Sequence, residues 1–254
     1  MTGFLTFRKA CAGVLLATSL VSAAMAADIA VLSAGAIEPG LKAAASAFEK
    51  QTGHSVNITF NTAPELKKRM DSNPAFDVVI APPAVMGEFA AASKLTGTLA
   101  NVGRVGVGVA VRDGAPLPDI STADALKASV LAAQSLVFNR ASTGLYLESL
   151  LKKMDVYAQV ESKTTRYPDG ASVMEHIIKG NGREIGFGAV TEILLYNGKG
   201  LKLVGPLPAA IQNYTAYTAA PVASGANQAL AQQFVVFLSG PIGKPLFVAA
   251  GVTD

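Results

Sequence analysis

Hydrophobic and polar positions follow two alternating periods along the first part of the chain. Short apolar runs predict three strands there, at residues 29–32, 56–60 and 78–81. Each run is followed by apolar residues at helical spacing, as where Leu41 and Phe48 share one face of a predicted helix. Strands that alternate with helices pair in parallel, so the pattern predicts an α/β fold.

The same alternation continues to the C-terminus. Further apolar runs predict strands at residues 105–111, 136–138, 185–189, 203–204 and 215–219. Apolar spacing predicts helices near residues 122–132, 147–154, 173–178, 227–238 and 242–250. Small polar loops follow several of these strands, and in open α/β sheets ligands bind at that edge. We therefore expect a ligand site built from loops at the ends of strands.

The N-terminus has the three-part pattern of a secretory signal peptide, which we assign to residues 1–26. Arg8 and Lys9 supply the positive start, residues 11–24 are apolar or small, and Ala-Met-Ala at 24–26 fits the small-x-small cleavage rule. The alternative is an uncleaved N-terminal anchor, although the apolar stretch is short for a hydrocarbon core of roughly 30 Å. We expect a periplasmic protein with no membrane insertion after cleavage.

Composition excludes several classes of protein. Half of the residues are hydrophobic and 15% are charged, which excludes a disordered chain. A formal charge of +3 gives no reason to expect nucleic-acid binding, and one cysteine excludes a disulfide framework. His54 and His176 have no second histidine or cysteine near them, so we expect no metal site. The glycine motifs of nucleotide sites and the serine-hydrolase elbow are missing, so we expect no cofactor.

Four small, polar loops lead into predicted helices: residues 33–36, 61–64, 140–144 and 169–172. The first turn of a helix has free backbone N–H groups and a dipole that attracts negative charge, so converging loops of this kind favour an anion site. In the third loop Ser142 or Thr143 is the expected N-cap, and Arg140 could hold a carboxylate through two parallel hydrogen bonds. The alternative is a set of ordinary helix caps with an exposed arginine. Asp169 could cap its own helix.

Five short motifs occur in an order and spacing typical of one family of proteins. They are the opening strand and loop at 29–36, Phe-Asp-Val-Val-Ile at 76–80, Gly-Leu-Tyr at 144–146, Ile-Gly-Phe-Gly at 185–188 and the run ending in Gly-Pro at 235–241. On these motifs the chain resembles the periplasmic solute-binding proteins of ABC importers, specifically the molybdate-binding-protein-like family. The resemblance covers essentially all of the chain after the signal peptide.

The resemblance implies a type II periplasmic-binding-protein fold. Its two α/β lobes, each a mixed sheet flanked by helices, are joined by two hinge strands and hold the ligand in the cleft between them. Lobe I would comprise residues 27–106 and 216–254, lobe II residues 107–215, and the hinges would lie near 104–108 and 205–217. A monomer that delivers a small anion to the permease of an ABC importer is the implied function.

The resemblance and the loop pattern together give these candidate ligand-binding residues: Ser33, Ala34, Asn61, Thr62, Arg104, Arg140, Ser142, Thr143, Gly170 and Ala189. The chain departs from the molybdate binders, since Ala36 and Ala189 stand at positions that carry Ser and Tyr in that family. Fewer hydroxyl donors, with Arg104 and Arg140 near the expected cleft, favour an organic di- or tricarboxylate over molybdate or tungstate.

An enzyme on the same fold is the second hypothesis, because some relatives of this branch are similar to an exported aconitate isomerase. Such an enzyme needs arginines that hold carboxylates and a base that moves an allylic proton. Asp169, Glu192 and Tyr146 are the candidate bases, and no residue pattern favours one of the carboxylates. Tyr146 fits helix packing better.

Overall fold

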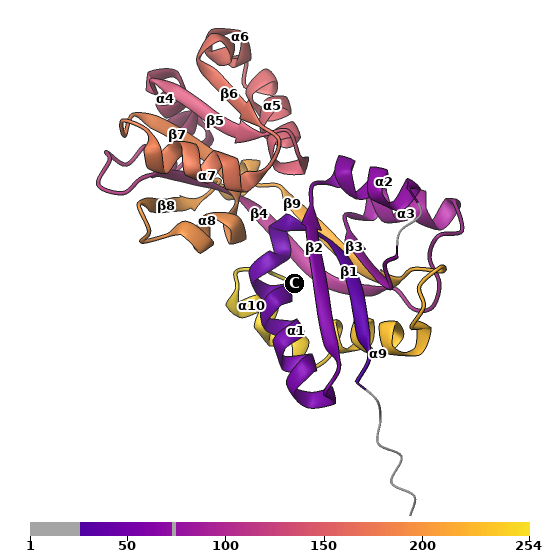
Figure 1. Cartoon of the computed structure of the whole chain (residues 1–254). Helices are drawn as coiled ribbons and strands as arrows, with labels where there is room; N and C mark the ends of the chain where they lie inside the picture. Colours follow the sequence, from indigo (N-terminus) through magenta and orange to yellow (C-terminus); the bar gives the residue numbers. More distant parts are fainter. Residues whose placement is uncertain (1–25, 73–74) are drawn as a thin grey trace, which may run out of the picture.

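The computed structural model describes residues 26–72 and 75–254. The predicted signal peptide lies outside the described residues except for Ala26. Figure 1 shows two groups of helices and strands that are connected by two long strands, β4 (Ala100–Arg112) and β9 (Tyr214–Pro221). In the described part of the chain no helix combines the length and the apolar content needed to cross a membrane.

The first lobe contains the N-terminal strands and the C-terminal helices (Figure 1). Its strands, besides β9 and the first half of β4, are β1 (Asp28–Ala34), β2 (Ser55–Asn61) and β3 (Val78–Ala81). Its helices are η1 (Gly35–Ile37), α1 (Glu38–Thr52), α2 (Ala63–Asp71), α3 (Pro83–Ala91), α9 (Gln228–Ser239) and α10 (Gly243–Ala249). Strand β1 pairs in parallel with β2 and β3, and β3 pairs antiparallel with β9.

The second lobe is formed by the middle of the chain. Its strands, besides the second half of β4, are β5 (Ser135–Asn139), β6 (Thr164–Tyr167), β7 (Glu184–Ala189) and β8 (Leu201–Pro206). Its helices are α4 (Ala123–Ala132), α5 (Ser142–Lys153), α6 (Tyr157–Val160), η2 (Glu161–Lys163), α7 (Gly170–Lys179), α8 (Val190–Tyr196) and η3 (Ala209–Ile211). Strand β5 pairs in parallel with β6 and β7.

Strand β4 belongs to both sheets. Its residues 100–106 pair antiparallel with β9, and from Val107 onward it pairs antiparallel with β7 and β8. The strand order is therefore β2-β1-β3-β9-β4-β7-β5-β6, with β8 paired to β4 outside this path. This mixed arrangement confirms the predicted α/β class with mixed sheets. The two connecting strands, β4 and β9, make only antiparallel pairs, so parallel pairing holds only for the pairs β1–β2, β1–β3, β5–β6 and β5–β7.

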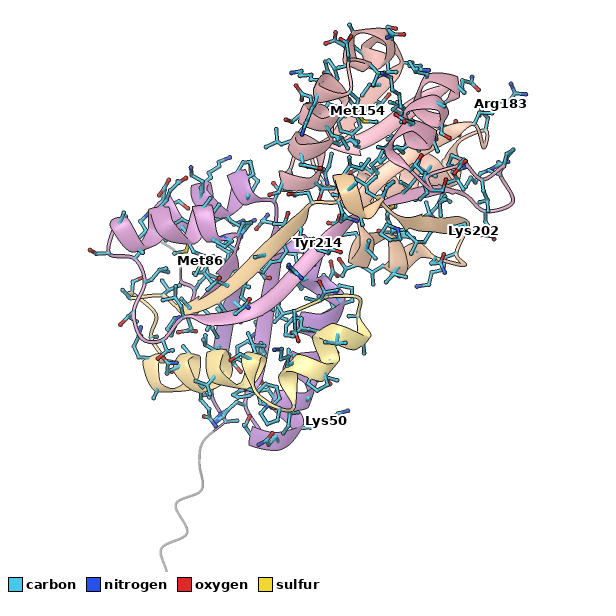
Figure 2. All side chains as sticks on the ribbon, turned by 180° about the vertical axis from the view of Figure 1, so that it is seen from behind. Lys50, Met86, Met154, Arg183, Lys202 and Tyr214 are labelled. Atoms are coloured by element: carbon cyan, nitrogen blue, oxygen red, sulfur yellow. The ribbon has the colours of Figure 1, made fainter. Side chains whose placement is uncertain are left out.

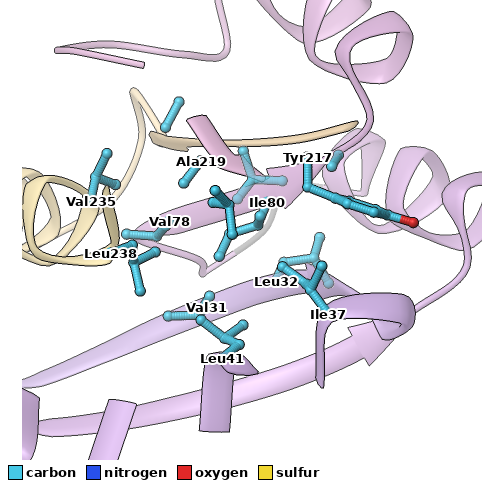
Figure 3. Packing of buried hydrophobic residues seen from close by; sticks show 14 of the residues in the cluster. Val31, Leu32, Ile37, Leu41, Val78, Ile80, Tyr217, Ala219, Val235 and Leu238 are labelled. Carbon is cyan, nitrogen blue, oxygen red and sulfur yellow. The ribbon is translucent and has the colours of Figure 1, made fainter. Parts of the chain in front are cut away.

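Each lobe has its own hydrophobic core. In the first lobe aliphatic side chains from β1, β3, α1 and α9 pack together, among them Val31, Leu41, Val78 and Leu238 (Figure 3). In the second lobe one cluster is centred on β5 and α5, and another lies between α7 and α8. Each lobe therefore has the packing of a separate folding unit.

The two lobes meet around the side chain of Gln212. Its Oε1 accepts a hydrogen bond from the Val107 N–H at 2.8 Å, and its Nε2 donates to the Val107 carbonyl at 3.0 Å. Figure 2 shows Tyr214 at this junction, where β9 begins. Gln212 thus ties the segment that enters β9 to the residue at which β4 changes sheets.

Candidate functional site

A cleft of about 340 Å³ lies between the two lobes. Its walls come from the ends of β1, β2, β5 and β6 and from the helices that follow those strands. Helix α8 and Tyr217 of β9 complete the lining. The site is therefore assembled from loops at strand ends on both lobes, as the alternating pattern predicts.

The wall of the first lobe is built from small residues and one helix start. Ala34, Gly35 and Ala36 line the cleft where β1 ends. Beside them, after the neighbouring strand β2, Thr62 is the N-cap of α2, whose first turn contains Pro64. The Thr62 hydroxyl makes no capping hydrogen bond, so it stays available on the cleft side.

The wall of the second lobe depends on Asn139, the last residue of β5. Its Oδ1 accepts hydrogen bonds from the backbone N–H groups of Ala141 and Gly144, both at 3.1 Å. A Cβ on Gly144 would stand 1.7 Å from the Asn139 carbonyl oxygen, so only glycine fits there. The N-cap of α5 is Ala141, which corrects the prediction of Ser142 or Thr143. The helix begins earlier because Asn139 turns the chain before the two hydroxyl residues, which become its first two residues.

Helix α7 begins at the next loop of the same lobe. The Asp169 carboxylate accepts a hydrogen bond from the Ser172 N–H at 2.8 Å, so it caps its own helix. Gly170 follows on the cleft side, and a Cβ there would meet the Glu192 Oε2 at 2.2 Å. The missing side chain of Gly170 therefore makes room for the Glu192 carboxyl.

Glu192 is an unusual acid for its position. It stands in the first turn of α8, is half-buried, and lines the cleft. Burial raises the pKa of this carboxyl to about 7, since water no longer stabilises its charge; the backbone at Ala189 partly opposes the shift, and the nearby Asp169 and Glu38 add to it. Glu192 can therefore gain or lose a proton near neutral pH.

Tyr217 forms the floor of the cleft on the first lobe. Figure 3 shows its ring extending from the aliphatic cluster, with the hydroxyl at the far end. Burial raises the pKa of this phenol, with a smaller contribution from Glu192, so Tyr217 stays protonated and can donate or accept a hydrogen bond.

Helix α8 packs in the second lobe through Ile193 and also contacts the first lobe. The Thr191 hydroxyl donates a hydrogen bond to the Ala36 carbonyl, and Thr191 itself is fully buried. Ala189, directly before the helix, packs in the hydrophobic core of the first lobe. The groups that α8 contributes to the cleft are thus held against the end of β1.

One family of proteins matches nearly the whole described chain. The profile of the bacterial extracellular solute-binding proteins matches residues 29–253. The chain belongs to this family. The match confirms the family resemblance inferred from the five motifs and agrees with the two-lobe fold.

Three similar proteins illustrate the range of this solute-binding protein's relatives. An aconitate isomerase from Pseudomonas sp. is 27% identical over 232 residues, which cover 89% of this chain and 87% of the relative. The periplasmic molybdate-binding protein of Azotobacter vinelandii has the same fold, with a TM-score of 0.73 and 18% identity over 89% of this chain and 99% of that one. The L-phospholactate-bound PEB3 structure aligns with a TM-score of 0.69 and 12% identity over 89% of this chain and 100% of that one.

Most of the residues expected at the site of this solute-binding protein line its cleft. They are Ala34, Asn61, Thr62, Ser142, Thr143 and Gly170, together with the two carboxylates Asp169 and Glu192. Each lies at the end of a strand, at a helix N-cap or in the first turn of a helix. The four small, polar loops of the sequence predict a site of this kind, built at the starts of helices.

Three of the other expected residues lie outside the lining for packing reasons. Ser33 is fully buried in β1, and its hydroxyl donates to the Ala34 carbonyl at 3.1 Å. Arg140 has an exposed side chain, because the turn made by Asn139 directs it away from the lining. Ala189 is buried in the core of the first lobe.

Arg104 also lies outside the cleft lining. Its guanidinium stands 4.7 Å from the centre of the Tyr214 ring, and its backbone pairs with Thr253. None of the described residues that line the cleft is a lysine or an arginine. Neither candidate arginine is therefore among the described residues that line the cleft, and Arg104 lies at the junction beside Tyr214.

Several lining residues were not expected from the sequence. Asn139 had a usable signal, since an Asn side chain often accepts a hydrogen bond from the backbone N–H two residues on, here that of the N-cap Ala141. Glu38, Tyr196 and Tyr217 had none, because their positions depend on how α1, α8 and β9 are placed in space. Tyr146, weighed as a base, donates its hydroxyl to the Ile211 carbonyl at 2.7 Å and so acts in packing.

Proposed function

We propose that this protein captures a small anion in the interlobe cleft and delivers it to the permease of an ABC importer. The protein would act as a periplasmic monomer after cleavage of residues 1–26. The observation that carries the proposal is the convergence of the first turns of α2, α5 and α7 on one cleft. Free N–H groups and helix dipoles at these positions attract negative charge.

The cleft has the size and the donors for a small acid. A volume of about 340 Å³ is at the small end of the range for small-molecule sites. The hydroxyls of Thr62, Ser142 and Thr143 and the phenol of Tyr217 supply further hydrogen bonds. Relatives named for molybdate, L-phospholactate and aconitate all act on anions, and two of these are organic acids. We propose an organic carboxylate as the ligand. Backbone N–H groups at the helix starts would bind its carboxylate, the role that the sequence predicted for arginine.

Closure of the cleft would follow from bending at the junction. We propose that residues 27–106 with 216–254 and residues 107–215 move as two bodies on the strands near 104–108 and 205–217. Each body has a core of its own, and Gln212 fixes the geometry where the strands cross. Hinge closure around a ligand is a common device of two-lobe proteins.

A thermal-shift screen of the purified protein tests the proposal. The anions are trans-aconitate, cis-aconitate, citrate, molybdate, tungstate, sulfate and phosphate. A ligand that binds only the folded state raises the melting temperature according to RT ln(1 + [L]/Kd). At least one organic acid should raise it, and a shift with molybdate or tungstate alone would contradict the organic-acid assignment.

A charge placed at the start of α5 tests the location of the site. Ser142→Asp puts a carboxylate at the first helical residue, where it stabilises the helix by roughly 0.3–1 kcal/mol but repels an anion in the cleft. Ala123→Asp makes the same change at the first residue of α4, which does not line the cleft. The affinity for an anion that the screen identifies should fall at least tenfold in S142D and stay unchanged in A123D. If S142D and A123D bind the anion with equal affinity, the start of α5 does not contact the ligand.

A second candidate function is isomerisation of an unsaturated tricarboxylate such as aconitate, favoured by the titratable Glu192 in the cleft. The ionised carboxylate would take a proton from the methylene carbon of the substrate and return it to the other end of the three-carbon unit. The double bond moves, and no oxidant or cofactor is consumed. Asp169 is less suited, because its carboxylate already caps α7. Conversion of cis- to trans-aconitate that falls about 10²-fold or more in E192Q would support this function.

A further inference from the structure

Among the residues that the structure describes, four carboxyl groups line the cleft, and three have surroundings that account for them. Glu38 pairs with Lys42, whose Nζ lies 2.5 Å from its Oε1. Asp169 accepts the Ser172 N–H at 2.8 Å. Glu65 is exposed to solvent in the first turn of α2. The negative charge of each of these three carboxylates is therefore stabilised by an ion pair, a hydrogen bond or solvent.

Glu192 is the exception among the four. Its carboxyl oxygens lie at Gly170, and a Cβ on Gly35 of the other lobe would be 3.7 Å from Oε1, so the group sits where the lobes approach each other. Among the described residues no lysine, arginine or histidine forms an ion pair with it. A negative charge there would face an incoming anion at short range.

Every titratable group that acts on Glu192 is itself an acid. Asp169 faces it from the start of α7 and Glu38 from the start of α1, and both disfavour its ionised form. The phenols of Tyr196, on the same helix, and Tyr217, on β9, also feel the charge of Glu192. Nothing in this set stabilises a carboxylate when a second negative charge enters the cleft.

We infer that Glu192 takes part in anion capture as a neutral carboxylic acid, so that each anion bound brings one proton from solvent to this side chain. The inference rests on the anion capture proposed above. The neutral acid donates its O–H to an oxygen of the ligand, whereas the carboxylate could only repel it. Burial already brings the pKa of Glu192 to about 7, so protonation near neutral pH costs little. A bound anion raises that pKa further.

Calorimetric titration measures the proton directly. The protein is titrated with trans-aconitate and, separately, with molybdate, in Tris and in HEPES, whose different heats of ionisation report the number of protons exchanged. At about pH 8 close to one proton should be taken up for each anion bound. Above about pH 7 the affinity should fall roughly tenfold for each pH unit.

Two variants locate the proton. Glu192→Gln keeps a neutral hydrogen-bond donor, so it should bind without proton uptake, with an affinity that no longer falls with pH. Glu192→Ala also removes the titrating group and should lose the uptake as well, whatever its affinity. Glu88→Gln makes the same change at an exposed carboxylate on α3, outside the cleft lining, and should behave like the wild type.

The possible results distinguish failure of this inference from failure of the proposed anion capture. Uptake in the wild type and in E88Q but in neither Glu192 variant supports the inference. The inference is overturned if the wild type binds an anion without taking up a proton, or if proton uptake persists in E192Q. It is also overturned if the protein isomerises aconitate at a rate that rises with pH through 7 and depends on Glu192. None of these results contradicts anion capture itself. If neither anion binds at acidic or alkaline pH, capture of these anions fails, and the inference fails with it.

Discussion

The Glu192 carboxyl and the α-carbon of Gly170 are in close contact: a Cβ on Gly170 would stand 2.2 Å from the Glu192 Oε2. Gly170→Ala should therefore push the carboxyl out of its buried position. Because the displaced atom ends a flexible side chain, the free energy of unfolding should fall by only roughly 1 kcal/mol. The affinity for a bound anion should fall at least tenfold, since the added methyl group and the displaced carboxyl both enter the cleft. Urea unfolding and calorimetric titration measure the two effects.

Gly87→Ala is the matched control for this change. Gly87 lies inside α3 and is exposed, and a Cβ there meets nothing within 4 Å. Alanine should stabilise the helix by roughly 0.5–1 kcal/mol and leave the affinity unchanged. If G170A binds anions as tightly as the control does, the carboxyl does not bound the ligand space.

The raised pKa of Glu192 predicts a pH dependence of stability. Its pKa is about 7 in the folded protein against an ordinary value of 4.5, so the folded state holds the proton more tightly than the unfolded state. Wild-type stability should fall, relative to Glu192→Gln, as pH rises from 4.5 to about 7 and level off above that. Between acidic pH and a pH above 7, the wild type should lose roughly 3 kcal/mol of stability relative to the variant.

Urea unfolding of both proteins across this pH range measures the difference. The ordinary case of a salt-bridged carboxylate has the opposite sign, with the wild type gaining stability as pH rises. Two stability curves that stay parallel from acidic to alkaline pH would mean that Glu192 titrates normally and is well hydrated in the cleft.

Much of the fold could be predicted from local pattern, because the strands of the two cores are short apolar runs followed by amphipathic helices. The runs at 78–81 and 136–138 are buried strands as expected. The strand Thr164–Tyr167 was missed, because its sequence TTRY has no apolar alternation. The strand predicted at 105–111 extends over Ala100–Arg112, since its first half pairs with β9 and that pairing is not a local property.

The candidate site could be predicted only where local sequence decides the position. Thr62, Ser142 and Gly170 are at helix starts, and helix starts are encoded by neighbouring residues. The arginines could not be predicted in the same way. Arg104 and Arg140 are close to the cleft along the chain, but the direction of their side chains depends on the register of β4 and on the turn made by Asn139.

The junction between the lobes depends on Gln212. Its side chain makes two hydrogen bonds to the backbone of Val107, at 2.8 and 3.0 Å. Gln212→Ala leaves both backbone groups without these partners and should lower the free energy of unfolding by roughly 1–3 kcal/mol. Gln51→Ala, at an exposed position in α1, should change it by less than about 0.5 kcal/mol. Urea unfolding compares them, and equal stability of the two variants would show that water replaces Gln212 at the junction.

The contact between Thr191 and Ala36 holds α8 against the first lobe. Thr191→Val keeps the shape of the side chain but removes the hydroxyl that donates to the Ala36 carbonyl. The carbonyl loses this partner, so the free energy of unfolding should fall by roughly 1–2 kcal/mol. Thr165→Val, at an exposed position of β6, is the control and should be close to neutral.

The same pair of variants tests what α8 does for the site. Glu192 follows Thr191 directly, so a loosened helix should let water reach the carboxyl and lower its pKa from about 7 toward the ordinary value of 4.5. The stability difference between T191V and the double variant T191V/E192Q should then vary less with pH than the difference between wild type and E192Q. An unchanged pH dependence would mean that the Glu192 environment is set by α7 and Gly170 alone, and that the contact with Ala36 serves only to join the lobes.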